Sequence, residues 1–236
     1  MEISVKNKRV TLFTTTPIQF NESLVNVYVE EFSKKGLVPS VTKGLGIRIT
    51  PQGLVTEEVI SLELKKLNDT FKVSFGPDRI DIESNKSDEQ LSEFLQLAKE
   101  VEQILSTKLH LVFIRLALCE NVLYVVSEAQ KSLAYQNILI GEEPSPVEWQ
   151  FQNVKRSKLI SNGEQQIVLD VNEVYTLKSP ETTGNPIVVL DIDINTKLGP
   201  TSEQISAVKE SFWPFASEII EKTKDSYTEK LFHGNE

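Results

Sequence analysis

The sequence predicts an α+β fold in which two similar halves form a mostly antiparallel sheet covered by helices. Runs of alternating apolar and polar residues, typical of strands with one buried face, recur in both halves. The order strand, helix, strands, helix occurs twice. The hexamers SDEQLS (87–92) and TSEQIS (201–206) each open a helical pattern after such runs. We therefore expect two intimately packed halves, 1–107 and 108–236, that arose by duplication.

The composition is that of an ordinary soluble globular protein and excludes several classes. Of the 236 residues, 39% are hydrophobic and 25% charged. The net charge of −9 argues against nucleic-acid binding, because phosphate recognition needs a surplus of Lys and Arg. The single cysteine, Cys119, excludes an internal disulfide and a thiolate zinc site. With no signal-peptide core and no apolar run near the ~18 residues of a membrane span, we expect a cytoplasmic protein without membrane contact or cofactor.

The first half reads as a strand, a helix, about four strands and a closing helix. β-branched and aromatic residues with period-two alternation mark the strands, and apolar residues three and four apart mark the helices. The predicted elements cover, in order, 9–16, 21–36, 41–83 and 87–105. Ser87 and Gln90 match a capping box, in which side chains and backbone N–H groups satisfy each other at a helix start.

The second half repeats this order. The predicted elements cover, in order, 109–126 (strand), 127–139 (helix), 147–160, 165–177 and 186–195 (strands) and 202–231 (helix). Both faces of the strand 109–126 are apolar, so we expect it to be central and covered on two sides. Thr201 and Gln204 offer a second capping box. Pro214 should kink the last helix, because it lacks an N–H donor and clashes with the preceding turn.

Three short patterns are similar to those of an uncharacterised family of bacterial proteins of similar size. They are a P-D-R-I turn at 77–80, an R-L-x-L strand at 115–118 and a late L-D-I-D strand at 190–193. The resemblance implies a bacterial or phage system, defence-associated through genes near mobile elements and defence loci, and brings no activity with it. The element order resembles the TATA-box-binding-protein-like fold, which implies a curved sheet with long helices on its convex side. DNA binding does not carry over to this acidic chain.

Asp191 and Asp193 form the most enzyme-like pattern. Residues two apart on a strand share a face, so both carboxylates are candidates to hold a divalent cation for phosphoryl transfer. The alternative is a one-sided strand whose apolar residues face the core while the two aspartates face water. No phosphate-binding glycine loop and no nucleophile elbow accompanies the pair. We therefore assign no catalytic residue.

Arg115 lies within the apolar strand pattern, where a buried guanidinium must be paired. Asp170, Asp191 and Asp193, from neighbouring strands, are the expected partners in a structural ion pair. The functional alternative is a ligand-binding role, because the arginine fork is well shaped for an anion or a carboxylate.

Three aromatic residues, Phe212, Trp213 and Phe215, surround Pro214 in the last helix. Three large rings around a kink cannot all face one side, so we expect Trp213 to be exposed and the group to bind a partner. The alternative is that all three pack onto the sheet.

These observations leave three functional hypotheses. The leading one is a non-enzymatic protein-interaction or regulatory module of a bacterial or phage system. It would bind another protein, or a second copy of the chain, through Trp213 and unpaired sheet edges. The second is a small-molecule-binding protein with a pocket under the sheet and Arg115 at its polar end. The third is a metal-dependent phosphoryl-transfer enzyme that uses Asp191 and Asp193.

Overall fold

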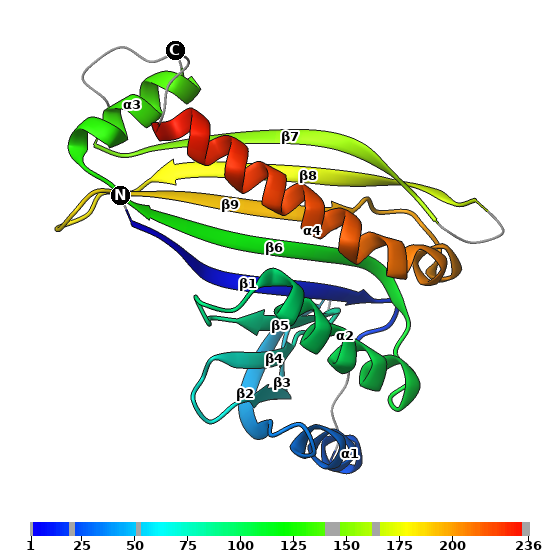
Figure 1. The fold of residues 1–236 in the computed structure, drawn as a ribbon. Coiled ribbons are helices and arrows are strands. Elements are labelled where there is room, and N and C mark those ends of the chain that lie inside the picture. The colour runs from blue at the N-terminus through cyan, green and yellow to red at the C-terminus, as the bar shows by residue number, and fades with distance from the viewer. Residues whose placement is uncertain (1, 19–21, 51–52, 140–146, 162–165, 233–236) are drawn as a thin grey trace.

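The computed structural model describes residues 2–18, 22–50, 53–139, 147–161 and 166–232, which form nine strands and four helices (Figure 1). The strands are β1 (Glu2–Thr14), β2 (Val38–Thr50), β3 (Gly53–Lys65), β4 (Phe71–Phe75), β5 (Arg79–Ser84), β6 (Phe113–Val125), β7 (Trp149–Ile160), β8 (Val168–Ser179) and β9 (Ile187–Thr196). The helices are α1 (Glu22–Ser33), α2 (Leu91–Thr107), α3 (Glu128–Leu139) and α4 (Ser202–Phe232). Within these residues, no helix combines the length and the apolar character needed to cross a bilayer.

All nine strands belong to one antiparallel sheet in the order β2-β3-β4-β5-β1-β6-β9-β8-β7. The first strands of the two halves, β1 and β6, pair at its centre, from Glu2 opposite Val125 to Thr14 opposite Phe113. Outward from this pair, the other strands of each half follow in reverse chain order, so each half forms one wing of the sheet. The predicted α+β fold with a mostly antiparallel sheet is confirmed, and the two halves share a single sheet.

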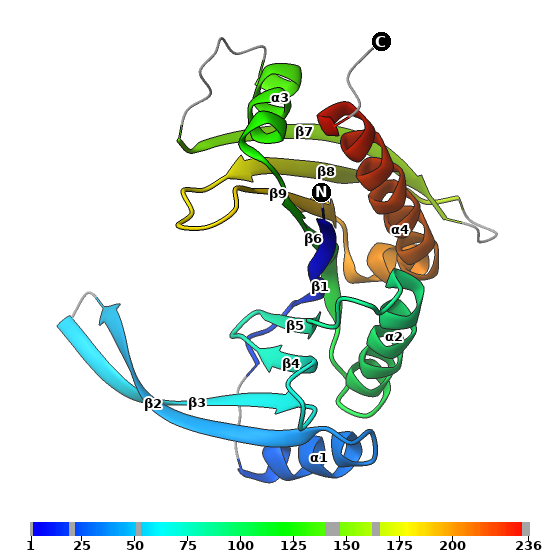
Figure 2. The ribbon, with the colours of Figure 1, turned by 60° about the vertical axis from the view of Figure 1, so that its left-hand side comes forward.

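The sheet is curved, and the helices lie on its convex side (Figure 2). The strands alternate accordingly: in β5, Ile80 and Ile82 are buried, whereas Asp81 and Glu83 on the other side are half-buried. The core consists of such sheet residues together with the apolar faces of the helices. No described helix covers the concave side, which we call the open face. β6 is central as predicted, but only its convex side is covered by described helices.

Three predicted elements begin at least four residues away from their start in the structure. β1 begins at Glu2 rather than near residue 9, because its first, less apolar residues also pair with β6. β6 begins at Phe113 rather than 109. α2 begins at Leu91 rather than 87, and its first turn is fixed by the Gln90 backbone N–H, which donates to the Glu93 carboxylate at 3.3 Å. The expected capping box of Ser87 is therefore wrong.

The two similar hexamers occupy different positions relative to their helices. TSEQIS opens α4 as predicted: the Thr201 N–H donates to Gln204 Oε1 at 2.9 Å, and the Gln204 N–H donates to Thr201 Oγ1 at 3.3 Å. SDEQLS lies mostly before α2, which begins at the fifth residue of that hexamer. The hexamers are therefore not structurally equivalent. The halves share an order of elements, and their origin by duplication stays a prediction.

The longest helix, α4, contains Pro214 and continues on both sides of it. In Figures 1 and 2 its first turns run in a different direction from the rest of the helix, which is the bend that the proline predicts. Apolar residues on both sides of the bend, including Val208 and Ile220, are buried against the molecule. The bend therefore lets one long helix follow the curved sheet.

A cluster of buried charges lies between the sheet and α4. Lys8 of β1 and Glu120 of β6 are cross-strand partners, 1% and 2% exposed. Lys224 of α4 donates to Glu120 Oε1 at 2.9 Å, and Lys8 donates to the backbone carbonyl of Lys86 at 3.0 Å. Glu120 Oε2 is buried with no hydrogen-bond partner among the described residues. Burial therefore raises the pKa of Glu120, although Lys224 opposes the shift.

We expect Glu120 to stabilise the fold less as the pH rises above about 4.5, the ordinary pKa of this carboxyl. Because its folded pKa is raised, the folded state holds the proton more tightly than the unfolded chain, and that stabilisation disappears as the pH passes the folded pKa. Urea unfolding between about pH 4.5 and 8 should show the wild type losing free energy of unfolding relative to Glu120→Gln. A difference that stays constant with pH would contradict this.

Candidate functional site

The open face of the sheet presents its side chains in rows that run across the strands. Directly paired residues on antiparallel strands project to the same side, and every second residue of a strand belongs to that side. The register of the sheet therefore brings together residues that lie far apart in the sequence. Two adjacent rows cross the centre of the sheet, where β1 and β6 pair.

The first row is largely charged and the second is polar. From β4 to β7, the charged row consists of Lys72, Glu83, Arg9, Cys119, Asp193, Val174 and Val154. From β1 to β7, the polar row consists of Asn7, Asn121, Asp191, Thr176 and Gln152. Most of these side chains line one hollow of about 470 Å³. We call this the central hollow.

Arg9 is half-buried at the middle of the charged row. Its cross-strand neighbour Glu83 is engaged elsewhere, since Lys72 Nζ lies 3.0 Å from Glu83 Oε2. Among the described residues, the guanidinium makes one hydrogen bond, from Nη2 to Cys119 Sγ at 3.6 Å. Its Nε is buried and has no partner in the described part of the chain. A group with five N–H donors therefore meets a single weak acceptor.

Asp191 and Asp193 both project from β9 onto the open face, as predicted. Asp191 accepts hydrogen bonds from the Asn121 amide and from Lys178 Nζ, the latter at 2.7 Å. Asp193 accepts one from Asn195 Nδ2 at 3.0 Å. The described residues contain no group of three or more His, Cys, Asp or Glu placed to hold a metal ion. A metal-binding role of the pair stays a prediction.

Arg115 is half-buried near the start of β6, outside the central hollow. Its Nη2 donates to Asn195 Oδ1 at 2.8 Å, and its Nε donates to the backbone carbonyl of Thr196 at 3.1 Å. The guanidinium also lies 4.8 Å from the ring centroid of Phe13. In the described contacts its partners are thus an amide and a carbonyl, not the expected aspartates. A ligand-binding role of Arg115 stays a prediction.

The expectation that Trp213 is exposed is wrong. Its side chain is only 2% exposed and packs edge-on against the buried Phe212, with 5.0 Å between ring centroids. Phe215 is half-buried, and the exposed residue at the bend is Pro214. The successive rings of Phe212 and Trp213 can both be buried because α4 packs against the sheet with one side and against α2 with an adjacent side. Trp213 lines the groove of about 1050 Å³ between these helices. None of the three rings of Phe212, Trp213 and Phe215 is exposed, so the surface at the bend offers no large aromatic side chain to a partner.

Trp213→Ala should lower the free energy of unfolding by about 3–5 kcal/mol, the usual loss when a buried Trp is truncated. The ring and its packing against Phe212 are lost, and a cavity remains next to α2. Urea denaturation followed by circular dichroism measures the change, with Trp213→Phe as the control that keeps an aromatic ring and loses less. A loss below about 1 kcal/mol for the alanine variant would argue against burial.

Cys119 separates Arg9 from Asp193 in the charged row. Burial, and then the Asp193 carboxylate, raise the pKa of its thiol to about 12, although Arg9 opposes the shift. The thiol is therefore protonated at neutral pH, and the thiolate that nucleophilic catalysis requires is scarce.

We expect Cys119 in the folded protein to resist iodoacetamide at about pH 8, because the reagent attacks the thiolate. In urea, where burial is lost, the same treatment should modify it fully. The mass of the intact protein reports the reaction without ambiguity, since the chain contains one cysteine. Labelling of the native protein as fast as that of the unfolded chain would refute the raised pKa.

No protein-family model and no curated protein sequence matches the chain.

Sequence reasoning found Asp191 and Asp193 but missed Arg9 and the polar row. The alternation of β1 places Arg9 on one face of a strand, yet nothing local to that strand tells which strands lie beside it. The pairing of Arg9 with Cys119 joins residues of different halves. Register between such strands depends on the whole sheet, so no short-range signal could have revealed the central hollow.

Proposed function

We propose that the protein is a non-enzymatic interaction or regulatory module that binds another protein through the open face of its sheet. The observation that carries this proposal is the one-sided cover of the sheet: the described helices lie on the convex side (Figure 2). The strand register places side chains from β4 across to β7 on the concave side. A broad surface suits a protein partner, because a specific interface takes about 800 Å² from each partner.

The charges of the open face also favour a protein partner over a nucleic acid. Positive and negative side chains on this face form ion pairs: Lys72 with Glu83, Arg79 with Asp81, Lys178 with Asp191, and Lys158 with Asp170. Exposed pairs of this kind add little to stability. Interspersed charges of both signs complement a partner of mixed charge, whereas a phosphate backbone requires a uniformly basic surface.

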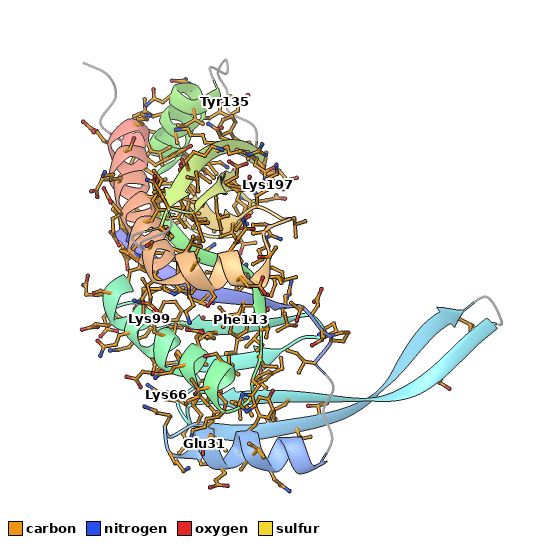
Figure 3. The ribbon with its side chains drawn as sticks, turned by 90° about the vertical axis from the view of Figure 1, so that its right-hand side faces the viewer. Glu31, Lys66, Lys99, Phe113, Tyr135 and Lys197 are labelled. Carbon is orange, nitrogen blue, oxygen red and sulfur yellow. The ribbon has the colours of Figure 1, made fainter. Side chains whose placement is uncertain are left out.

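The hairpin of β2 and β3 adds a second contact element beside the open face. The two strands pair along their whole described length, from Val38 opposite Lys65 to Thr50 opposite Gly53. Only the base of β3, residues 63–65, also pairs with β4. The outer hairpin therefore projects beyond the sheet, away from the helices (Figure 3). Leu54, near its tip, is 73% exposed.

A bacterial or phage setting in the cytoplasm, with a defence association, is part of the same proposal. It rests on the three short patterns at 77–80, 115–118 and 190–193 and on composition.

Reversing one exposed charge on the open face should weaken partner binding several-fold. Arg156→Glu changes the open side of β7, whereas Lys155→Glu changes the next residue of the same strand, which is also exposed but projects toward the helix side. Quantitative mass spectrometry of proteins that co-purify from the encoding organism should show stoichiometric partner in the wild type and in Lys155→Glu, and less in Arg156→Glu.

Equal loss of the partner in both variants would place the interface elsewhere, and absence of any stoichiometric partner would reject the proposal. Both positions are exposed, but Lys155→Glu also loses the cation–π contact with Tyr175 at 5.7 Å and places a carboxylate opposite Glu173, so it should be somewhat less stable than Arg156→Glu. Thermal unfolding of each variant checks that binding, and not folding, has changed.

A further inference from the structure

The central hollow contains several charged groups, most of which are paired within the protein. Asp191 is paired with Lys178 at 2.7 Å, and Glu83 with Lys72 at 3.0 Å. A neutralised pair contributes little net charge to the space beside it. Glu120 also lines the hollow, but it is paired with Lys224 of α4. The unpaired charges that the open face presents to a ligand are those of Arg9 and Asp193.

Arg9 and Asp193 carry opposite charges, yet among the described residues neither forms an ion pair. They lie directly opposite Cys119 on its two sides, Arg9 on β1 and Asp193 on β9. Their backbones are thus two strand spacings apart, on the order of 10 Å. The thiol between them accepts a hydrogen bond from Arg9 Nη2 at 3.6 Å and donates one to the Asp193 carboxylate; being protonated, it neutralises neither charge. The two charges face one hollow from its two sides.

Both groups also have hydrogen-bonding capacity that the protein does not use. The described contacts of the Arg9 guanidinium end at the thiol, and its Nε is buried without a partner. Asp193 accepts hydrogen bonds from Asn195 Nδ2 and from the Cys119 thiol, whereas an ionised carboxylate offers about four acceptor positions. The buried Nε–H of Arg9 has lost hydration that no described residue replaces. A ligand that brings an acceptor to Arg9 would restore it.

We propose that the central hollow binds a small zwitterion of the α-amino-acid type, with its carboxylate on Arg9 and its ammonium group on Asp193. This goes beyond the proposed protein partner. The nitrogen and the carboxylate carbon of an amino acid are about 2.5 Å apart, given bonds of about 1.5 Å. With a hydrogen bond of about 2.9 Å at each end, the ligand bridges roughly 8 Å, which fits two side chains that flank one thiol.

The rest of the hollow fits the same ligand class. Its volume of about 470 Å³ exceeds the backbone of an amino acid and leaves space for a side chain beside Val174. The amides of Asn121 and Gln152 offer both donors and acceptors to it. A simple anion would be repelled by Asp193, and a simple cation by Arg9, whereas a zwitterion satisfies both charges. An arginine fork, moreover, matches a carboxylate with two parallel hydrogen bonds.

The test uses free L-amino acids, titrated one at a time into the full-length protein and followed by calorimetry. We expect at least one amino acid to bind saturably. Its half-ligands, acetate and methylammonium, should bind at least about tenfold more weakly, because each makes only one of the two charged contacts. Arg9→Gln and Asp193→Asn should each weaken the amino acid at least about tenfold. Arg156→Gln removes a positive charge from the same face outside the hollow and should leave affinity unchanged.

A second measurement on the wild type keeps the test decisive if a variant fails to fold. In ¹⁵N NMR spectra, the Arg9 side-chain Nε–H resonance should shift on addition of the amino acid. The proposal would be overturned if no amino acid bound saturably, or if acetate bound as tightly as the amino acid. It would also be overturned if binding survived both substitutions, or if the Arg9 resonance did not move. None of these outcomes depends on a protein partner, so the two proposals can fail separately.

Discussion

The antiparallel pairing of β1 with β6 is the interaction on which the rest of the structure depends. It is the strand pairing that joins the two wings, and its register places Lys8 opposite Glu120 and Arg9 opposite Cys119. Because neighbouring residues point to opposite faces, the first pair lies beneath α4 and the second on the open face. A slip of one residue would exchange them, bringing Arg9 under the helices and Lys8 to the concave side.

Because the sheet is curved and the described helices cover only its convex side, the residues of its two faces have different roles. The convex side holds the apolar core, where α4 bends at Pro214 and buries Trp213 against α2. The concave side is free of this packing constraint in the described part of the chain, and it holds side chains that form cross-strand pairs and hydrogen bonds. Arg9 and Asp193 are exceptions there, since their capacity is not filled by their neighbours. The unfilled hydrogen-bonding capacity of these two residues thus lies on the face that no described helix covers.

Much of the fold could be predicted because its signals are local. Period-two alternation identified the strands around Ile80 and Ile192, and the capping residues Thr201 and Gln204 identified the start of α4. Properties that depend on distant parts of the chain could not be predicted. Trp213 is buried because α2 lies at its side, a fact that no pattern within α4 contains. The neighbours of Arg9 follow from the order of strands in the sheet, which alternation leaves open.

The position of β1 at the centre of the sheet has a consequence during synthesis of the chain. Of the nine strands it is synthesised first, yet it pairs with residues 79–84 on one edge and with β6 on the other. Until those segments leave the ribosome, both edges of β1 lack their partners, and unpaired edges of this kind invite association between chains. Before it is paired, β1 has three cations among its apolar residues, namely Lys6, Lys8 and Arg9. The charges that later lie on both faces of the finished sheet thereby act against such association.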